Sequence, residues 1–156
     1  MSNQDAARTL FGVASLLESQ GANPYRVRAY RRAALSLLRL AIPAEQLTDA
    51  DGQLNLPWLG PRLRRKLGEL VTMGRMQFHV ELIAELPPAL RELLSVPGVG
   101  PKTAERLIRE LDIRSVAQLA EAASRGRLRA LRGIGEIKER RLGEAAAATL
   151  QLAEAA

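Results

Sequence analysis

A glycine-containing turn between two predicted helices is the strongest chemical signal in this sequence. It reads Val-Pro-Gly-Val-Gly at residues 96–100, here named hairpin 2, and Pro101 opens the helix that follows. Glycine allows backbone angles that a side chain would obstruct and lets a ligand approach the main chain. The N–H groups of the turn and the positive end of the next helix then face one point, a geometry that binds phosphate. The expected contact residues are Gly98, Val99, Gly100, Lys102 and Thr103.

The frame around this turn distinguishes it from a glycine-rich linker between helices, which is the alternative interpretation. A lone Gly-x-Gly would favour the linker. Here Pro97 lies in the turn, Val99 between the glycines is expected to point inward, and Ala104 is small where the two helices cross. Together these residues favour a ligand-binding hairpin.

Two further turns depart from this pattern to different degrees. Hairpin 3, residues 131–135, keeps both glycines, but Glu139 stands in the place of Ala104, so it could bind phosphate or only pack. In hairpin 1, residues 56–60, Trp58 replaces the first glycine and Arg64 replaces the small residue. Trp58 could block phosphate, stack on a base or sugar, or be buried or face a partner. The further candidate contacts are Gly133, Gly135, Lys138, Gly60, Arg62, Arg65 and Arg26.

Helices are expected to position these turns, because composition and periodicity favour an all-α fold. Only 3% of the 156 residues are aromatic, and an aliphatic core of Leu and Ala suits helices better than sheets. Helical apolar spacing occurs before Gly21, where Asn3 and Asp5 can cap the helix, and again after Pro24. The second of these helices is expected to bury Val27, Tyr30, Ala34, Leu37 and Leu38.

Further helical segments are expected along the rest of the chain. They lie after Pro61, over about residues 76–86 and 90–94, after Gly100 and Ser115, and in the Ala-rich C-terminal region, which is expected to face solvent. No segment alternates between apolar and polar residues, so no sheet is expected. We predict a four-helix unit with hairpin 1 over residues 1–74, and a unit with hairpins 2 and 3 over residues 75–156.

Charge and cysteine content narrow the class of protein. The formal net charge is +6 and the isoelectric point about 10.7 despite 17 acidic residues, which indicates a folded protein with an anionic partner, or a basic surface kept for solubility. The absence of cysteine excludes disulfides, thiolate zinc sites and a cysteine nucleophile. The polar N-terminus is unlike a signal peptide, and no apolar run approaches the roughly 18 residues of a membrane span. We therefore expect a cytoplasmic protein with no membrane partner.

Three features in this order resemble the N-terminal region of family X DNA polymerases, especially the bacterial branch. They are the segment at residues 23–34 (Asn-Pro-Tyr-Arg-Val-Arg-Ala-Tyr-Arg-Arg-Ala-Ala), hairpin 1 and hairpin 2. The resemblance covers nearly the whole chain and implies a small lyase-type domain followed by a helix-hairpin-helix fingers domain. The polymerase palm, with its metal-binding aspartates, would follow hairpin 3, and neither it nor the phosphoesterase domain is in this sequence. We therefore expect either a free-standing relative or a fragment, without polymerase activity by that mechanism.

The resemblance also implies a ligand for the hairpins. In the family, hairpin carbonyls hold a monovalent cation, Na⁺ or K⁺, between protein and phosphate. The matching carbonyls in hairpin 2 belong to Leu94, Val96 and Val99, and those in hairpin 1 to Leu54, Leu56 and Leu59. No other cofactor is expected. Because hairpin contacts go to phosphate, the binding should not read sequence.

The lyase chemistry of the family implies a role for Lys66. In some members a lysine amine attacks the aldehyde of a 5′-deoxyribose phosphate, forms a Schiff base, and elimination follows. Only three of the 23 basic residues are lysines, and arginine cannot form that Schiff base because it stays protonated. Tyr30 matches a tyrosine beside the sugar phosphate, and Arg26 and Arg62 match phosphate-holding residues. Arg65 replaces a family carboxylate, so it remains open whether Lys66 is a nucleophile or a phosphate contact.

Three hypotheses follow from these observations. The first is a non-enzymatic protein that binds gapped, nicked or 5′-phosphorylated DNA in repair, with a possible repair-protein partner. The second is a deoxyribose phosphate lyase that acts through Lys66, with Arg64 and Arg65 lowering its amine pKa. The third is a protein-interaction adaptor that has lost DNA contact. His79, the single histidine, is expected to lie on a helix at or near the surface.

Overall fold

The computed structural model describes all 156 residues and contains eight α-helices, two short 3₁₀ helices and no named β-strand. The only β-type pairing is an isolated bridge between Thr48 and Leu54. This confirms the predicted all-α fold. The chain divides into two compact units, Met1–Glu85 and Leu86–Ala156. None of the helices combines the length and the apolar character that crossing a membrane requires.

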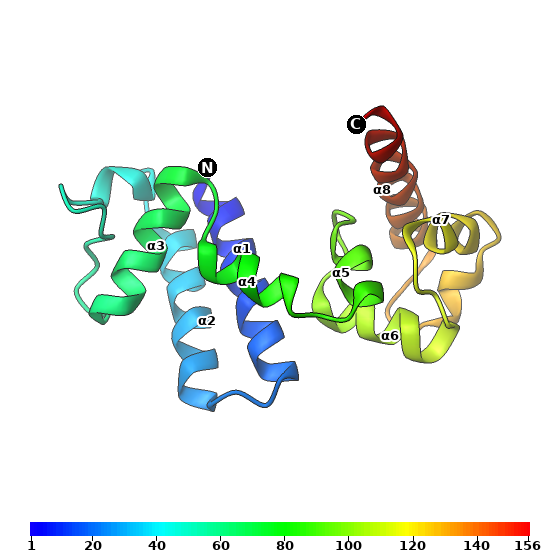
Figure 1. The fold of residues 1–156 in the computed structure, drawn as a ribbon, viewed down its shortest axis with the longest axis horizontal. Helices are drawn as coiled ribbons and strands as arrows, with labels where there is room; N and C mark the ends of the chain where they lie inside the picture. Colours follow the sequence, from blue (N-terminus) through cyan, green and yellow to red (C-terminus); the bar gives the residue numbers. More distant parts are fainter. The chain divides into compact units, whose positions relative to one another are not determined.

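The first unit is a helical cluster built on the pair α1 and α2, which lie side by side (Figure 1). A turn at Gly21, with φ 70°, joins the two helices. The elements are α1 (Asn3–Ser19), α2 (Pro24–Arg39), η1 (Ala44–Leu47), α3 (Pro61–Met73) and α4 (Gln77–Ala84). Their buried aliphatic residues include Leu10, Val13, Leu17, Leu37, Leu54, Leu67 and Leu70.

One predicted core position of α2 was wrong. Leu38 is 48% exposed, whereas Val27, Tyr30, Ala34 and Leu37 are buried as expected. Neighbouring residues on a helix point about 100° apart, so the inward position of Leu37 turns Leu38 toward solvent.

The start of α1 also differs from the prediction. Its N-cap is Ser2, whose hydroxyl oxygen accepts a hydrogen bond from the Asp5 amide. Asn3 instead ties the helix to a distant segment, because its side chain donates to the Ile42 carbonyl and accepts from the Ala44 amide, both at 2.8 Å. This pair of bonds fixes the connection between α2 and η1.

Helix α4 belongs to the first unit. Met76, just before the helix, is completely buried, and Phe78 stacks on Tyr30 of α2 with the ring centroids 5.9 Å apart. The contacts therefore divide the chain after Glu85, whereas the sequence predicted a boundary near Gly74. Gly74 does end α3, with φ 71°, but the chain stays in the same unit afterwards.

The second unit contains hairpins 2 and 3. Its elements are α5 (Pro88–Leu94), α6 (Pro101–Leu111), α7 (Val116–Ser124), η2 (Arg127–Ala130) and α8 (Glu136–Ala155). Helices α7 and α8 pack so closely that a Cβ on Gly143 would lie 2.8 Å from the Cβ of Ala123. The core is aliphatic and includes Leu93, Leu107, Leu119, Leu128 and Leu131.

Candidate nucleic-acid interface

Hairpin 2 joins α5 to α6 through a turn that short backbone hydrogen bonds hold. The Val99 amide donates to the Val96 carbonyl at 3.0 Å, and the Ala104 amide donates to the Gly100 carbonyl at 2.9 Å. Gly98 has φ 90°, a left-handed value that favours glycine. Val99 is 6% exposed and lies in the core of the second unit, which confirms that it points inward.

The outer rim of hairpin 2 presents main-chain amides without acceptors inside the chain. The amides of Gly98, Gly100 and Thr103 make no hydrogen bond, so among residues 97–100 only Val99 donates internally. Both glycines are exposed. Unpaired amides at the start of a helix, where the helix dipole is positive, form a binding point for an anion. Lys102 adds an exposed ammonium group in the first turn of α6.

Neither the backbone angles nor the packing inside the chain require glycine at the second glycine of each hairpin. Gly60, Gly100 and Gly135 have φ values of −71°, −89° and −92°, which other residues adopt without strain. A Cβ built on any of them would meet no atom within 4 Å. A group from outside the chain can therefore approach the main chain closely at these three positions.

Hairpin 3 repeats the geometry of hairpin 2. Gly133 has φ 89°, and Ile134 is 6% exposed, with its amide donating to the Leu131 carbonyl at 3.1 Å. The Glu139 amide donates to the Gly135 carbonyl at 2.9 Å, as Ala104 does in hairpin 2. The two turns are therefore copies of one backbone structure.

The residue at the helix crossing of hairpin 3 is a buried acid rather than a small residue. Glu139 is 3% exposed. Its carboxylate accepts hydrogen bonds from the Arg129 side chain at 2.7 Å and from the Arg129 amide at 3.2 Å. Burial raises the pKa of Glu139, but these bonds outweigh burial and lower the pKa below its ordinary value. Glu139 is thus a packing residue that Arg129 neutralises.

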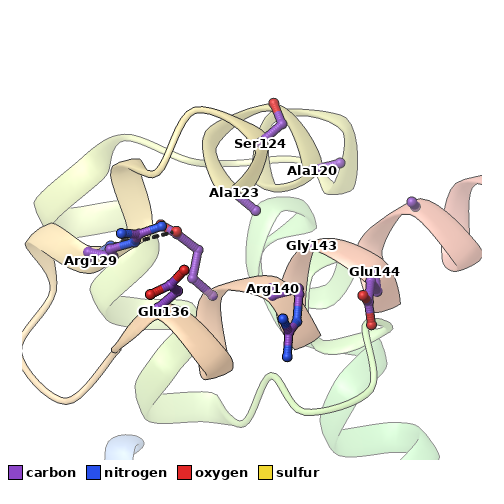
Figure 2. Close-up of a pocket in the computed structure, with 10 residues that line it drawn as sticks. Ala120, Ala123, Ser124, Arg129, Glu136, Arg140, Gly143 and Glu144 are labelled. Atoms are coloured by element: carbon purple, nitrogen blue, oxygen red, sulfur yellow. Dashed lines mark hydrogen bonds and ion pairs between the residues drawn. The ribbon is translucent and has the colours of Figure 1, made fainter.

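Hairpin 3 is electrostatically less suited to phosphate than hairpin 2. Glu136 begins α8 with an exposed carboxylate, where Pro101 begins α6. Arg129, Glu136, Arg140 and Glu144 line a cleft of about 450 Å³ between α7 and α8. Figure 2 shows these four side chains. Lys138 is exposed on the same helix. Cations and acids therefore alternate here, whereas the amides of hairpin 2 face no acid in the first turn of α6.

Hairpin 1 keeps the hydrogen-bond frame of the other two but not the left-handed residue. The Leu59 amide donates to the Leu56 carbonyl at 3.2 Å, and the Arg64 amide donates to the Gly60 carbonyl at 3.0 Å. Trp58, in the place of Gly98, does not have a positive φ. Its side chain is half-buried, with the Arg32 guanidinium 4.5 Å from its ring centroid. Tryptophan is therefore accommodated in hairpin 1, because the backbone at residue 58 is not left-handed.

The carbonyls that the resemblance assigned to a cation differ between hairpins 1 and 2. In hairpin 2 the Leu94 and Val99 carbonyls accept no hydrogen bond, whereas the Val96 carbonyl accepts one from the Val99 amide at 3.0 Å. Two of the three carbonyls assigned to the ion therefore have no partner inside the chain. In hairpin 1 the side chain of Arg64 donates to the Leu59 carbonyl at 2.9 Å and to the Leu56 carbonyl at 3.4 Å. A cation does not fit at carbonyls that a guanidinium already occupies.

A second cluster on the first unit surrounds Lys66. The Lys66 Nζ lies 3.4 Å from the Tyr30 hydroxyl and 3.7 Å from the centroid of the Phe78 ring. The Arg26 guanidinium also lies over Phe78, at 4.8 Å. The predicted residues Lys66, Tyr30 and Arg26 are thus brought together from α2 and α3. Phe78 of α4 was missed, because nothing in its local sequence links it to the other two helices.

The surroundings shift the pKa values of this cluster. Partial burial lowers the pKa of the Lys66 amine, and the charges of Arg26 and Arg62 lower it further, while Glu81 opposes them. Burial raises the pKa of Tyr30, although the charge and hydrogen bond of Arg26 act in the opposite direction. The cause at Lys66 differs from the prediction, since Arg64 is directed to hairpin carbonyls and the charges that act on the amine are those of Arg26, Arg62 and Glu81. More free amine at neutral pH follows, which favours nucleophilic attack.

The basic face of α2 borders a cleft of about 570 Å³ next to hairpin 1. Trp58 and Tyr25 line it together with three arginines and Gly60. The Arg28 guanidinium lies 4.6 Å from the Tyr25 ring centroid, and Arg31 pairs with Glu18 at 2.7 Å. Tyr25 is 76% exposed. The cleft therefore offers aromatic rings and guanidinium groups at the mouth of a hairpin.

Comparison with known proteins agrees with this geometry in both units. Residues 1–76 match the family described as a helix-hairpin-helix domain. Residues 90–148 match the family described as a SAM-like helix-hairpin-helix tandem. The chain is also 29% identical over 145 residues to the DNA polymerase/3′-5′ exonuclease PolX of Bacillus subtilis, an alignment that covers 93% of this chain. It spans about a quarter of the length of that relative, 25%.

Proposed function

Because this chain is a helix-hairpin-helix protein related to the family X DNA polymerases, we propose that it binds DNA at gaps and nicks through its hairpins. The contacts go to phosphate, so binding is independent of sequence. The net charge of +6 provides the long-range attraction to the strand. The setting is DNA repair, where gaps with 5′ phosphates arise.

The observation that carries this proposal is the repeated open glycine. Gly60, Gly100 and Gly135 have unstrained backbone and empty space where a side chain would be. Around Gly100 the amides of Gly98 and Thr103, next to and within the first turn of α6, have no acceptor inside the chain. A phosphate oxygen that accepts these amides needs the approach that a Cβ would close.

The cleft at Trp58 supports the preference for gaps over intact duplex. An unpaired base could stack on Trp58 or Tyr25, while the arginines of α2 hold the flanking phosphates. Stacking of one base on an aromatic side chain contributes about 1–3 kcal/mol. A base inside an intact duplex is already stacked and paired, so it gains nothing from the cleft.

Binding to matched DNA substrates tests the proposal. Fluorescence anisotropy should give tighter binding to a one-nucleotide gap with a 5′ phosphate than to intact duplex, and a steep loss of affinity with salt. Trp58 is the single tryptophan and lines the cleft, so its fluorescence reports on binding there. Its emission should change when gapped DNA binds, and should change less when the nucleotide opposite the gap lacks its base. Equal affinity for gapped and intact DNA would remove the gap preference. Salt-insensitive or absent binding would favour the protein-interaction adaptor.

A second candidate function, deoxyribose phosphate lyase, is favoured by the arrangement at Lys66. The neutral Lys66 amine would add to the C1′ aldehyde of a 5′-deoxyribose phosphate and lose water to form an imine. Loss of the C2′ proton to solvent would then break the C3′–O bond, with the electron pair leaving on the phosphate oxygen. Tyr30 and Arg26 lie beside the amine and would hold the sugar phosphate.

Borohydride trapping separates this candidate from simple phosphate binding. Hydride reduces the imine to a stable amine, so a lyase gives a covalent protein–DNA product. Lys66→Arg keeps the positive charge but cannot form the imine, so it should retain DNA affinity and lose trapping. Trapping that persists in Lys66→Arg would exclude Lys66, and no trapping of the unaltered protein would exclude the activity.

A further inference from the structure

The three hairpins carry side chains of different charge at one position, the residue four places after the second glycine. Its amide donates to that glycine's carbonyl in every copy, at 3.0, 2.9 and 2.9 Å. The side chains are Arg64 in hairpin 1, Ala104 in hairpin 2 and Glu139 in hairpin 3. The same backbone hydrogen bond is therefore accompanied by a cation, a neutral group and an acid in the three hairpins.

Arg64 is directed back into its own turn. Its Nε–H donates to the Leu59 carbonyl at 2.9 Å, and Nη2 donates to the Leu56 carbonyl at 3.4 Å. The equivalent carbonyl in hairpin 2, that of Val99, accepts no hydrogen bond. No carboxylate pairs with Arg64, which is half-buried. The guanidinium has five N–H donors, so donors remain beyond the two that the carbonyls take.

We propose that the Arg64 guanidinium is a built-in cation of hairpin 1, which makes phosphate binding at this hairpin independent of Na⁺ or K⁺. This inference rests on the proposed binding to DNA. The carbonyls of Leu56 and Leu59 hold the positive charge at the turn, and the remaining N–H groups face the phosphate that the turn receives. Hairpin 2 has no such side chain, so its carbonyls remain available to a monovalent ion.

The chemistry of the two charge carriers supports this division. A guanidinium stays protonated and forms directed, charge-assisted hydrogen bonds to phosphate. It is attached covalently, so its occupancy does not depend on the ion concentration. An alkali ion at hairpin 2 must be bound from solution. Hairpin 1 should therefore keep its affinity for the DNA phosphate when alkali ions are replaced by a bulky organic cation.

The test is the ion dependence of DNA affinity in Arg64→Ala, which gives hairpin 1 the side chain that hairpin 2 has. Affinity for gapped DNA is measured by anisotropy in KCl and in tetramethylammonium chloride at equal ionic strength. We expect Arg64→Ala to bind about tenfold more weakly in the organic salt and to recover most of that loss in KCl. The unaltered protein should show a smaller difference, which arises from hairpin 2.

Two further variants separate the effect of the Arg64 charge at the hairpin carbonyls from the loss of net positive charge and from the loss of side-chain packing. Arg65→Ala removes an exposed charge that touches no hairpin carbonyl, so it should weaken binding equally in both salts. Arg64→Met keeps most of the side-chain packing without the charge and should behave like Arg64→Ala. An Arg64→Ala protein with the potassium response of the unaltered protein, at unchanged melting temperature, would overturn the inference. Failure of the unaltered protein to bind DNA in either salt would instead refute the proposed function.

Discussion

Replacing Gly100 with alanine separates the binding role of hairpin 2 from its folding role. The backbone at Gly100 has φ −89° and ψ 174°, which alanine adopts without strain, and the new Cβ would contact nothing within 4 Å. Substitutions of this kind stabilise proteins by about 0.4–1 kcal/mol, because they restrict the unfolded chain. We therefore expect Gly100→Ala to melt at the same temperature as the unaltered protein or slightly higher.

The effect on DNA binding should have the opposite sign. The methyl group would occupy the open space through which a phosphate approaches the amides of Gly98, Gly100 and Thr103. A hydrogen bond to a charged group contributes about 1.5–3 kcal/mol. Loss of one such bond raises the dissociation constant by about 10- to 150-fold.

Anisotropy titration with gapped DNA and thermal melting of the same samples measure the two effects together. Gly12→Ala is a matched control, since Gly12 lies within α1 and its added Cβ also meets nothing within 4 Å. It should raise stability and leave affinity unchanged. Gly98→Ala should instead lower stability by about 1–2 kcal/mol, because φ is 90° there. Unchanged affinity of folded Gly100→Ala would refute the role of hairpin 2.

Three other substitutions check the remaining structure. Gly135→Ala should weaken DNA binding less than the hairpin 2 substitution, because the Glu136 carboxylate already disfavours phosphate at hairpin 3; the same anisotropy titration decides this. Gly68→Ala should destabilise the fold by about 3 kcal/mol, since its Cβ would lie 1.8 Å from the Gly52 carbonyl oxygen, and urea unfolding measures the loss. Burial lowers the pKa of His79, so the unfolded state binds the proton first as pH falls. Unfolding free energy should therefore drop as pH decreases from about 6.5 through the folded pKa, and His79→Gln should flatten that slope.

The hairpins could be predicted from the sequence because their determinants are local. A left-handed glycine, an inward apolar residue and a second glycine lie within three positions, at Gly98–Gly100 and again at Gly133–Gly135. The hydrogen bonds that shape each turn join residues three or four apart. Spacing alone therefore carries the information, and the two turns agree in φ to within one degree, 90° and 89°.

The surroundings of the reactive groups depend on long-range packing and could not be predicted in the same way. Phe78 reaches Lys66 only because α4 packs back on the first unit, twelve residues later in the chain. The pairing of Arg129 with Glu139 needs η2 and the start of α8 to meet. The sequence placed the Arg64 charge near Lys66, whereas its guanidinium is directed to the Leu59 carbonyl. The direction of a side chain depends on packing neighbours that are distant in the sequence, whereas the helical period can be read from local spacing.

Under the proposed binding to DNA, the charge at the helix crossing is expected to give the three hairpins different roles. Hairpin 1 holds a fixed guanidinium and borders the aromatic cleft, so it suits the point where the strand is interrupted and a base is free. Hairpin 2 offers bare amides and carbonyls that accept an ion, which suits a continuous backbone. Hairpin 3 has the same backbone, but its acid is already paired with Arg129, and Glu136 repels phosphate, so its main contribution is to the core of the second unit. If the proposed DNA binding holds, affinity for gapped DNA is expected to depend most on hairpins 1 and 2, because hairpin 3 presents the Glu136 carboxylate to phosphate.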